Sequence, residues 1–177
     1  MKGIEVITGC MFSGKTTELI SRLKNINADY LLIKPQIDNR GSDNKVSTHS
    51  GVAANAIKVN NLSDVLNLIE GVGVIGIDEA QFFNESIIHD LNYIKSKGLR
   101  IIIAGLEKDY LNKPFKSMLD ILSIADSVTR LTAICNKCGR DATCSYRKNT
   151  SSKKQLLIGD ANFYEARCEQ CFNVNQP

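Results

Sequence analysis

Gly9-Cys10-Met11-Phe12-Ser13-Gly14-Lys15-Thr16 is the octapeptide from which the architecture of this chain can be predicted. It matches the pattern G-x-x-x-x-G-K-[ST], in which the backbone N–H groups of a glycine-rich turn point at phosphate oxygens. An apolar run from Ile4 to Ile7 precedes it, and the segment from Thr17 to Leu23 that follows has helical spacing. This strand–loop–helix context makes a chance match rare, so the octapeptide predicts binding of a nucleoside triphosphate.

An acidic pair supplies the partner that such a loop needs. The run from Val72 to Ile77 is apolar without alternation, as expected of a central parallel strand, and it ends in Asp78-Glu79. Ligands of open α/β sheets bind beyond the carboxyl ends of the strands, so the pair should face the same crevice as the loop. Lys15 is expected to contact the β- and γ-phosphates, and Thr16 and Asp78 to hold Mg²⁺. Glu79 is expected to be the catalytic base, or in an ATPase to orient water.

The remaining pattern over residues 1–133 alternates apolar strands with helical segments. This alternation predicts an α/β fold, with a P-loop parallel sheet wound on both sides. The expected strands are 4–8, 30–33, 56–59, 72–77, 100–104 and 127–133, and the expected helices are 15–25, 62–69 (capped by Ser63), 84–97 and 113–125. Residues 36–51 are instead a polar excursion, long enough to be a functional or mobile loop.

Paired cysteines and polar loops replace this pattern after Ile134. We therefore expect a nucleotide-binding domain at 1–133 and a small zinc-binding domain at 134–177. The two C-x-x-C pairs suit a closed tetrahedral zinc site, and four protein ligands leave no position for water, so the zinc should be structural. The expected ligands are Cys135, Cys138, Cys168 and Cys171.

Two further cysteines lie outside this pattern. Cys144 is expected to be a bystander. Cys10 lies within the phosphate loop, where only its backbone N–H is needed, and the adjacent helix N-terminus is expected to lower the pKa of its thiol and make it reactive.

The bulk composition narrows the class of protein. The chain has 177 residues, of which 43% are hydrophobic and 23% charged, as in ordinary soluble globular proteins. It contains no apolar run long enough to cross a bilayer and no signal-peptide core, so a cytoplasmic protein without a membrane partner is expected. The net charge of +3 is too small to argue for nucleic acid. The basic residues Arg147, Lys148, Lys153 and Lys154 form a short run, which is more often a solvated loop.

The segment 139–167 between the two cysteine pairs has two readings. Anchored at both ends by a metal, it can be a lid over a substrate. Alternatively, a zinc ribbon grips nucleic acid through the basic residues and Tyr146 or Tyr164, which would make the chain a nucleic-acid-stimulated P-loop ATPase.

Taken together, the motifs resemble the cytosolic, zinc-containing thymidine kinase family over nearly the whole chain. The matching stretches are the octapeptide 9–16, Asp78-Glu79-Ala80-Gln81-Phe82-Phe83, Lys113-Pro114-Phe115, both C-x-x-C pairs, and Ile158-Gly159 followed by Tyr164. The resemblance implies transfer of the γ-phosphoryl group of ATP to the 5′-hydroxyl of thymidine, giving dTMP and ADP in pyrimidine salvage. Deoxyuridine is expected to be accepted as a close analogue. A kinase of another small acceptor would carry the same motifs.

The resemblance also implies which residues form the site. Glu79 matches the family's general base. The nucleotide-binding residues it implies are Gly9, Cys10, Met11, Phe12, Ser13, Gly14, Lys15, Thr16, Asp38, Asn39, Arg40, Asp78, Glu79, Ala80 and Gln81. The thymidine-binding residues it implies are Met11, Phe83, Leu106, Tyr110, Phe115, Gln155, Leu156, Leu157, Ile158, Gly159 and Tyr164, in which 155–159 would read the base through the backbone of a closing lasso loop. For Phe83 and Phe115, plain core packing is the alternative.

The family further implies a homotetramer inhibited by thymidine triphosphate, with no nucleic acid partner. Two positions depart from its usual pattern. Tyr110 ends a stretch that usually ends in phenylalanine, so its hydroxyl must find a partner, and Cys10 stands where proline is common.

Overall fold

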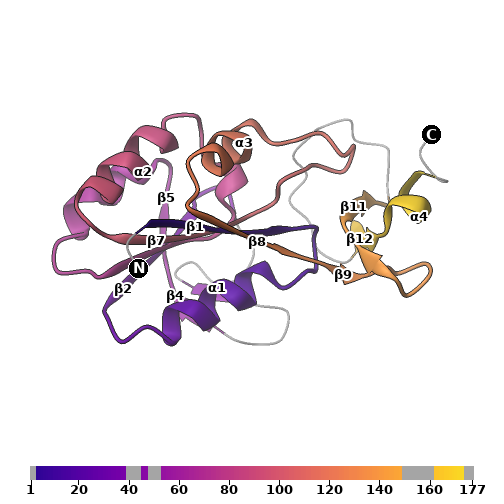
Figure 1. The fold of residues 1–177 in the computed structure, drawn as a ribbon, viewed down its shortest axis with the longest axis horizontal. Coiled ribbons are helices and arrows are strands. Elements are labelled where there is room, and N and C mark those ends of the chain that lie inside the picture. Colours follow the sequence, from indigo (N-terminus) through magenta and orange to yellow (C-terminus); the bar gives the residue numbers. More distant parts are fainter. Residues whose placement is uncertain (1–2, 39–44, 48–52, 149–161, 174–177) are drawn as a thin grey trace.

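The computed structural model describes residues 3–38, 45–47, 53–148 and 162–173 (Figure 1). Its centre is a six-stranded sheet in the order β5-β2-β6-β7-β1-β8, in which every neighbouring pair is parallel. The strands are β1 (Gly3–Gly9), β2 (Tyr30–Pro35), β5 (Ile57–Val59), β6 (Val74–Ile77), β7 (Arg100–Gly105) and β8 (Ser127–Leu131). The predicted α/β class with a parallel sheet is therefore confirmed.

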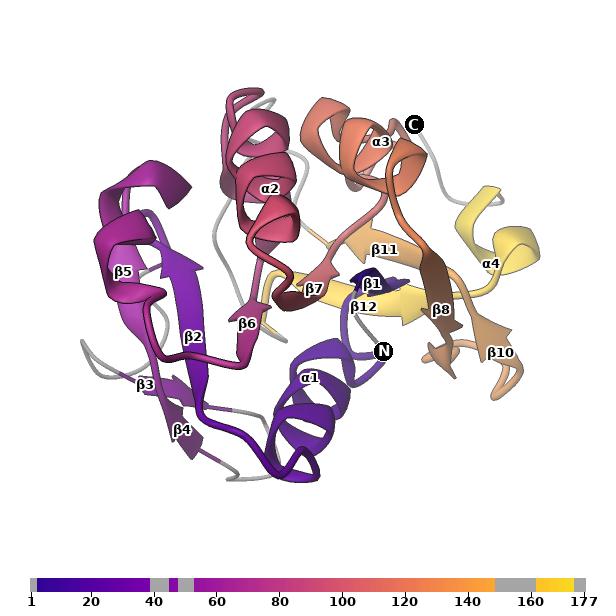
Figure 2. The ribbon, with the colours of Figure 1, turned by 60° about the vertical axis from the view of Figure 1, so that its left-hand side comes forward.

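Helices cover both faces of this sheet. One face carries α1 (Lys15–Lys24), and the opposite face carries α2 (Ile87–Ser96) and α3 (Lys116–Ser123) (Figures 1 and 2). Two 3-10 helices, η1 (Leu62–Leu68) and η2 (Ala80–Phe82), lie against α2 and α3 respectively. None of the helices in the described part of the chain is long and apolar enough to cross a bilayer.

The sheet separates two hydrophobic cores. On the α2 and α3 face, Ile75, Ile77 and Ile103 pack with Leu91 and Met118. The α1 face has its own cluster, which joins the helix to the alternate side chains of the same strands. Central strands buried on both faces have no reason to alternate apolar with polar residues, and for this reason the unbroken apolar runs in the sequence located them correctly.

The C-terminal part is smaller and lies at the end of the sheet where β1 and β8 finish (Figure 1). Its described residues form two two-stranded sheets and a short helix. Its elements are β9 (Ala133–Ile134) with β10 (Asp141–Ala142), β11 (Cys144–Arg147) with β12 (Tyr164–Arg167), and α4 (Glu169–Asn173).

The polar excursion contains an element that the sequence did not predict. β3 (Lys45–Ser47) lies inside it and pairs antiparallel with β4 (Ala53–Asn55), which begins just beyond it, so Val46 lies opposite Ala54. Short strands of this composition give too little apolar alternation to be recognised.

Several predicted boundaries also differ. The second helix is the 3-10 helix η1, and it is capped by Asn61, whose side chain forms a capping box with Asp64, rather than by Ser63. The helices predicted at 84–97 and 113–125 are shortened to α2 and α3. The strand predicted to reach residue 133 stops at Leu131, because the chain then turns into β9.

Gly9 closes β1 at a point where no side chain fits. Its φ is +153°, and a Cβ atom there would overlap the carbonyl oxygen of Leu131 and lie 2.7 Å from Ser13 Oγ. The first glycine of the octapeptide is therefore needed for close approach to β8 as well as for the turn.

We predict that Gly9→Ala lowers the free energy of unfolding by about 3 kcal/mol, because steric overlap adds to backbone strain. Urea denaturation measures this change. The matched control is Gly71→Ala, where φ is +79° but the space around the Cβ position is open. That variant should lose only about 1 kcal/mol, the conformational term alone. Equal losses in the two variants would contradict the close-approach explanation.

Candidate active site and metal centre

The phosphate loop connects β1 to α1 and has the backbone expected of an anion-binding turn. Phe12 and Gly14 adopt left-handed conformations, with φ of 66° and 84°. The Lys15 ammonium donates to the carbonyl oxygen of Cys10 at 2.7 Å, so the loop holds its own lysine. Ser13 Oγ is buried and has no hydrogen-bond partner among the described residues. A buried hydroxyl in this position is well placed to donate to a phosphate oxygen.

Thr16 and Asp78 meet across the edge of the sheet. The Thr16 hydroxyl donates to the Asp78 carboxylate, with distances of 3.1 and 3.2 Å to its two oxygens. Asp78 directly follows β6 and is 5% exposed. A hydroxyl next to a buried carboxylate beside a phosphate loop is a donor set that suits Mg²⁺, which prefers oxygen ligands and keeps several waters. The structure therefore brings together Thr16 and Asp78, the two residues predicted to hold Mg²⁺.

Glu79 is held in an uncommon backbone conformation at the end of β6. Its φ of 52° and ψ of 42° place it in the left-handed region, where non-glycine residues are rare. The Gln81 amide nitrogen donates to a Glu79 carboxylate oxygen, and the Gln81 amide oxygen accepts from the backbone N–H of Leu106 at 2.9 Å. Gln81, only 4% exposed, thus ties Glu79 to the loop that follows β7.

Of the other predicted site residues, some lie within the described part of the chain and some lie outside it. Asp38 follows β2, is 6% exposed, and lies at the same carboxyl edge of the sheet as the phosphate loop. Asn39 and Arg40 lie outside the described residues, as do Gln155, Leu156, Leu157, Ile158 and Gly159.

The apolar candidates are divided between the core and the edge of the site. Phe83 and Phe115 are buried in the cluster on the α2 and α3 face, and Leu106 packs against that cluster. Their burial agrees with the core-packing alternative, and Leu106 is also bonded to Gln81. These three side chains can therefore belong to the core and at the same time border the site.

Tyr110 stands on a compact loop between β7 and α3. Asp109 organises this loop, because its Oδ1 accepts from the backbone N–H groups of Leu111 (2.8 Å) and Lys113 (2.9 Å). The Phe115 N–H donates to the carbonyl oxygen of Glu107 at 3.0 Å and closes the base of the loop. Tyr110 is therefore presented from a loop with fixed backbone geometry.

The β11–β12 pair brings the C-terminal part against the phosphate loop. The Ser145 hydroxyl accepts from the backbone N–H of Met11 at 3.0 Å. Two residues further along β11, on the same face, Arg147 donates to the hydroxyl of its cross-strand partner Tyr164 at 3.2 and 2.8 Å. The guanidinium carbon of Arg147 also lies 3.5 Å from the centre of the Tyr110 ring.

Sequence reasoning missed Ser145 and misplaced Arg147. Arg147 was expected in a solvated loop, but it is 2% exposed, so that expectation is wrong for this residue, although Lys148 beside it is exposed. The available signal was the run Cys144 to Arg147 itself, which is a short strand whose alternate residues face the same way.

The prediction of a reactive Cys10 is also wrong. Cys10 is 4% exposed, and its thiol donates to the carbonyl oxygen of Ala142 at 3.2 Å. Burial raises the pKa of this thiol, and the nearby Lys15 ammonium lowers it too little to compensate. The helix N-terminus, which lowers a thiol pKa, can be read from the sequence, whereas the desolvation that raises it depends on the fold.

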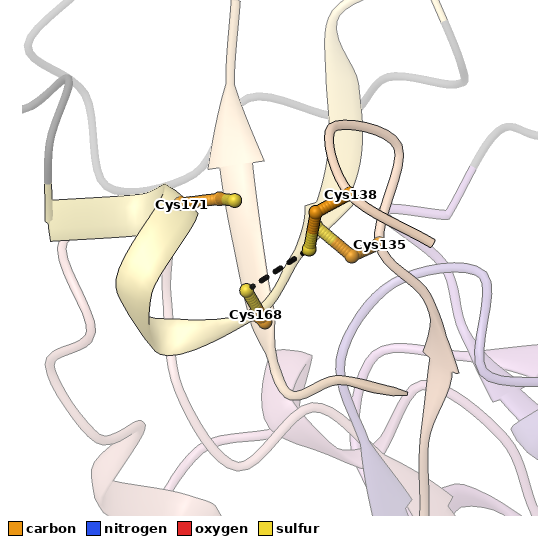
Figure 3. Close-up of side chains that lie close together, drawn as sticks. All are labelled: Cys135, Cys138, Cys168 and Cys171. Atoms are coloured by element: carbon orange, nitrogen blue, oxygen red, sulfur yellow. Dashed lines mark hydrogen bonds between the residues drawn. The ribbon is translucent and has the colours of Figure 1, made fainter. Parts of the chain in front are cut away.

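Four cysteines converge as predicted to form a candidate metal centre (Figure 3). Their sulfur atoms all lie within 4.8 Å of one another. Tetrahedral zinc with bonds of about 2.3 Å requires sulfur atoms about 3.8 Å apart, so the cluster fits a closed four-thiolate site. Cys135 and Cys138 belong to the β9–β10 turn, Cys168 follows β12, and Cys171 lies on α4.

Arg140 lies beside the cluster and donates to its sulfur atoms. Its Nε is 3.4 Å from Cys138 Sγ, and its Nη2 is 3.8 Å from Cys168 Sγ. The hydrogen bond from Arg140 lowers the pKa of the Cys138 thiol from its ordinary value. Metal ligands must be deprotonated, so this arginine favours the metal-binding form.

Comparisons with known proteins agree with the geometry. Residues 2–172 match the family model described as thymidine kinase. The thymidine kinase of Mycoplasma mobile is 41% identical over 172 residues, covering 95% of this chain and 86% of the relative. Those of Metamycoplasma arthritidis and Mesomycoplasma hyopneumoniae strain 7448 are 41% and 42% identical, covering 98% and 97% of this chain and 91% and 95% of the relatives. The Thermotoga maritima RuvB Holliday junction branch migration motor matches 73% of this chain and 37% of its own at 12% identity. Its TM-score of 0.45 is too low to bear on fold or function.

We predict that the purified chain carries about one metal ion and that Cys138→Ala removes it, because a closed site binds weakly once a thiolate is lost. Elemental mass spectrometry measures the metal content. The matched control is Cys144→Ala, a buried cysteine of the same region that stands outside the cluster, and it should keep its metal. Metal retained in Cys138→Ala, or lost equally from both variants, would contradict the assignment.

Proposed function

The chain belongs to the thymidine kinase family, and we propose how its own residues carry out the family's reaction. The enzyme transfers a phosphoryl group from ATP to thymidine and releases ADP. One observation supports the assignment of roles more than any other. The hydrogen bond between Thr16 and Asp78 joins the phosphate loop to the end of β6, so the base candidate Glu79 lies next to the phosphate site.

On the nucleotide side, the octapeptide 9–16 binds the ATP phosphates. Its inward N–H groups and the N-terminus of α1 attract the phosphate oxygens, and the free hydroxyl of Ser13 adds a donor. In this assignment Lys15 exchanges the carbonyl oxygen of Cys10 for the β- and γ-phosphates. The resemblance to the family also assigns to this site Asp38, Asn39, Arg40, Asp78, Ala80 and Gln81.

Thr16 and Asp78 would hold the magnesium ion that accompanies ATP. When bound, the ion neutralises charge on the transferring phosphoryl group. The oxygen ligands of these two residues support this assignment, because Mg²⁺ takes one or two protein oxygens and completes its shell with phosphates and water.

Glu79 acts as the general base. As the 5′-hydroxyl oxygen of thymidine bonds to the γ-phosphorus, the hydroxyl proton passes to the Glu79 carboxylate and the bond from the γ-phosphorus to the bridging oxygen breaks, leaving ADP. Gln81 keeps the carboxylate oriented through its hydrogen bond and is anchored in turn by Leu106. The strained backbone of Glu79 is consistent with a residue kept in position for chemistry.

The thymidine pocket is proposed to lie between the phosphate loop and the C-terminal part. Its walls are assigned to Met11, Phe83, Leu106, Tyr110, Phe115 and Tyr164, and the base is read by the backbone of residues 155–159. Support comes from the hydrogen bond between Met11 and Ser145, which brings the β11–β12 pair up to the phosphate loop. We also propose that the chain divides into a nucleotide-binding domain, 1–133, and a zinc-binding domain, 134–177.

The metal of the cysteine cluster is proposed to be zinc in a structural role. All four ligands are thiolates, which favour zinc, and a full tetrahedron leaves no position for a reacting water. The resemblance to the family adds three further proposals: a homotetramer, a cytoplasmic location, and inhibition by thymidine triphosphate. That nucleotide carries both a thymine base and a triphosphate, so one molecule can occupy both halves of the site.

Acceptor dependence tests the function. With Mg-ATP, ADP release is expected with thymidine and with deoxyuridine, and not with deoxycytidine, single-stranded DNA or no acceptor. A signal only with DNA would overturn the kinase assignment in favour of an ATPase with a zinc ribbon.

In the same assay Glu79→Gln should lower kcat at least about 100-fold, the usual contribution of a general base. Binding of ATP, measured by calorimetry, should hardly change, and an unaltered kcat would remove Glu79 from the role.

A further inference from the structure

Arg147 is a buried cation at the meeting point of three chain segments. It is the last residue of β11, Tyr164 is the first residue of β12, and Tyr110 belongs to the loop after β7. Its guanidinium carbon lies 3.5 Å from the centre of the Tyr110 ring and 5.3 Å from that of Tyr164. Two of its nitrogen atoms, Nε and Nη2, donate to the Tyr164 hydroxyl.

This arrangement suits arginine specifically. Taking a charge out of water is costly unless polar or π groups replace the water. A guanidinium is planar, so it can stack on one ring while its edge donates hydrogen bonds to another, whereas the ammonium of lysine is a compact point charge that cannot do both. The position therefore needs the shape of arginine as well as its charge.

The location of Arg147 connects it with substrate binding. Arg147 pairs with Tyr164 in register, and the next backbone hydrogen bond, from Lys148 N–H to the Phe163 carbonyl oxygen at 2.9 Å, lies where the chain leaves β11 and returns to β12. On the same face of β11, Ser145 contacts Met11 of the phosphate loop. The face of the strand pair that carries Ser145 and Arg147 thus contacts both the phosphate loop and Tyr110.

We propose that Arg147 is a positioning residue for thymidine, which holds the Tyr110 and Tyr164 rings as two walls of the acceptor pocket. The proposal rests on the function proposed above, in which both tyrosines belong to that pocket. Arg147 itself acts through the rings, so it should control thymidine binding and leave ATP binding and the phosphoryl transfer step largely unaffected.

The opposite face of the same strand pair provides an internal comparison. There Arg167 lies over the ring of Tyr146, with its guanidinium carbon 3.2 Å from the ring centre, and Tyr146 packs edge-on against Phe172 of α4. Both faces therefore carry an arginine stacked on a tyrosine. Of these two arginines, only Arg147 also contacts Tyr110. Variants of Tyr164 and Tyr146 can therefore distinguish a role in the pocket from general support of the fold.

The experiment compares Arg147→Lys, Arg147→Met and Tyr164→Phe with the matched control Tyr146→Phe. For each variant the thymidine KM, the ATP KM and kcat are measured, together with Tm and zinc content. Loss of a buried cation–π contact and of charge-assisted hydrogen bonds in Arg147→Met should raise the thymidine KM by about tenfold, with the ATP KM within about twofold of wild type. Arg147→Lys should recover only part of the loss.

Tyr164→Phe keeps the ring and removes only the acceptor, so it should raise the thymidine KM by about threefold, whereas Tyr146→Phe should not change it. In the double variant Arg147→Met with Tyr164→Phe, the two effects should not add, because Arg147→Met already removes the hydrogen bonds that Tyr164→Phe removes.

Two results would overturn the proposal while the wild-type chain still phosphorylates thymidine. One is an unchanged thymidine KM in Arg147→Met. The other is a parallel rise of both KM values with a lowered Tm, which would mark Arg147 as a residue that only supports the fold. If Arg147→Met does not fold, Tyr164→Phe decides, since equal KM values in Tyr164→Phe and Tyr146→Phe would contradict the proposal. A wild-type chain inactive on thymidine would instead refute the function on which it rests.

Discussion

The hydrogen bond from the Met11 amide to the Ser145 hydroxyl is the contact on which the arrangement of the site depends. It joins the phosphate loop, built by the first 16 residues, to a strand more than 130 residues later in the chain. A second bond, from the Cys10 thiol to the Ala142 carbonyl oxygen, lies beside it. The phosphate loop and the β11–β12 pair, which are the proposed donor and acceptor sides of the reaction, are therefore built against each other.

Small side chains make this close approach possible. Ala133, Ala142 and Ala166 form one buried cluster with Cys10 of the loop and with two of the candidate metal ligands, Cys135 and Cys168. Larger side chains would separate the loop from the β11–β12 pair, because interiors are close-packed and have little room to adjust. A metal bound by the four cysteines would consequently stabilise the layer that carries Ser145 and Arg147. This connection gives a physical reason for the structural role proposed above for the metal.

Local pattern was sufficient for much of the molecule. Local signals mark three features: the octapeptide, the apolar run before Asp78-Glu79, and the two cysteine pairs. The structure joins the octapeptide to Asp78, and it joins the two cysteine pairs to each other. What the sequence could not give depends on contacts between distant segments. In the sequence Arg147 belongs to a basic run, and only the fold places it against Tyr110 and Tyr164. Burial raises the pKa of the Cys10 thiol, and that burial depends on residues more than 120 positions away, which no local spacing reveals. The hairpin of β3 and β4 was missed for a different reason, namely strands too short to show a period.

The central claim is that the metal-bearing part builds the thymidine side of a site whose phosphate side belongs to the parallel sheet. Calorimetric titration of the metal-free chain with thymidine, and separately with a non-hydrolysable ATP analogue, tests it most directly. Because metal binding is coupled to folding of the segment around it, thymidine affinity should fall by at least about tenfold while affinity for the ATP analogue stays within about threefold. The retained nucleotide binding also shows that the sheet is still folded. Thymidine bound equally well with and without the metal would contradict the account.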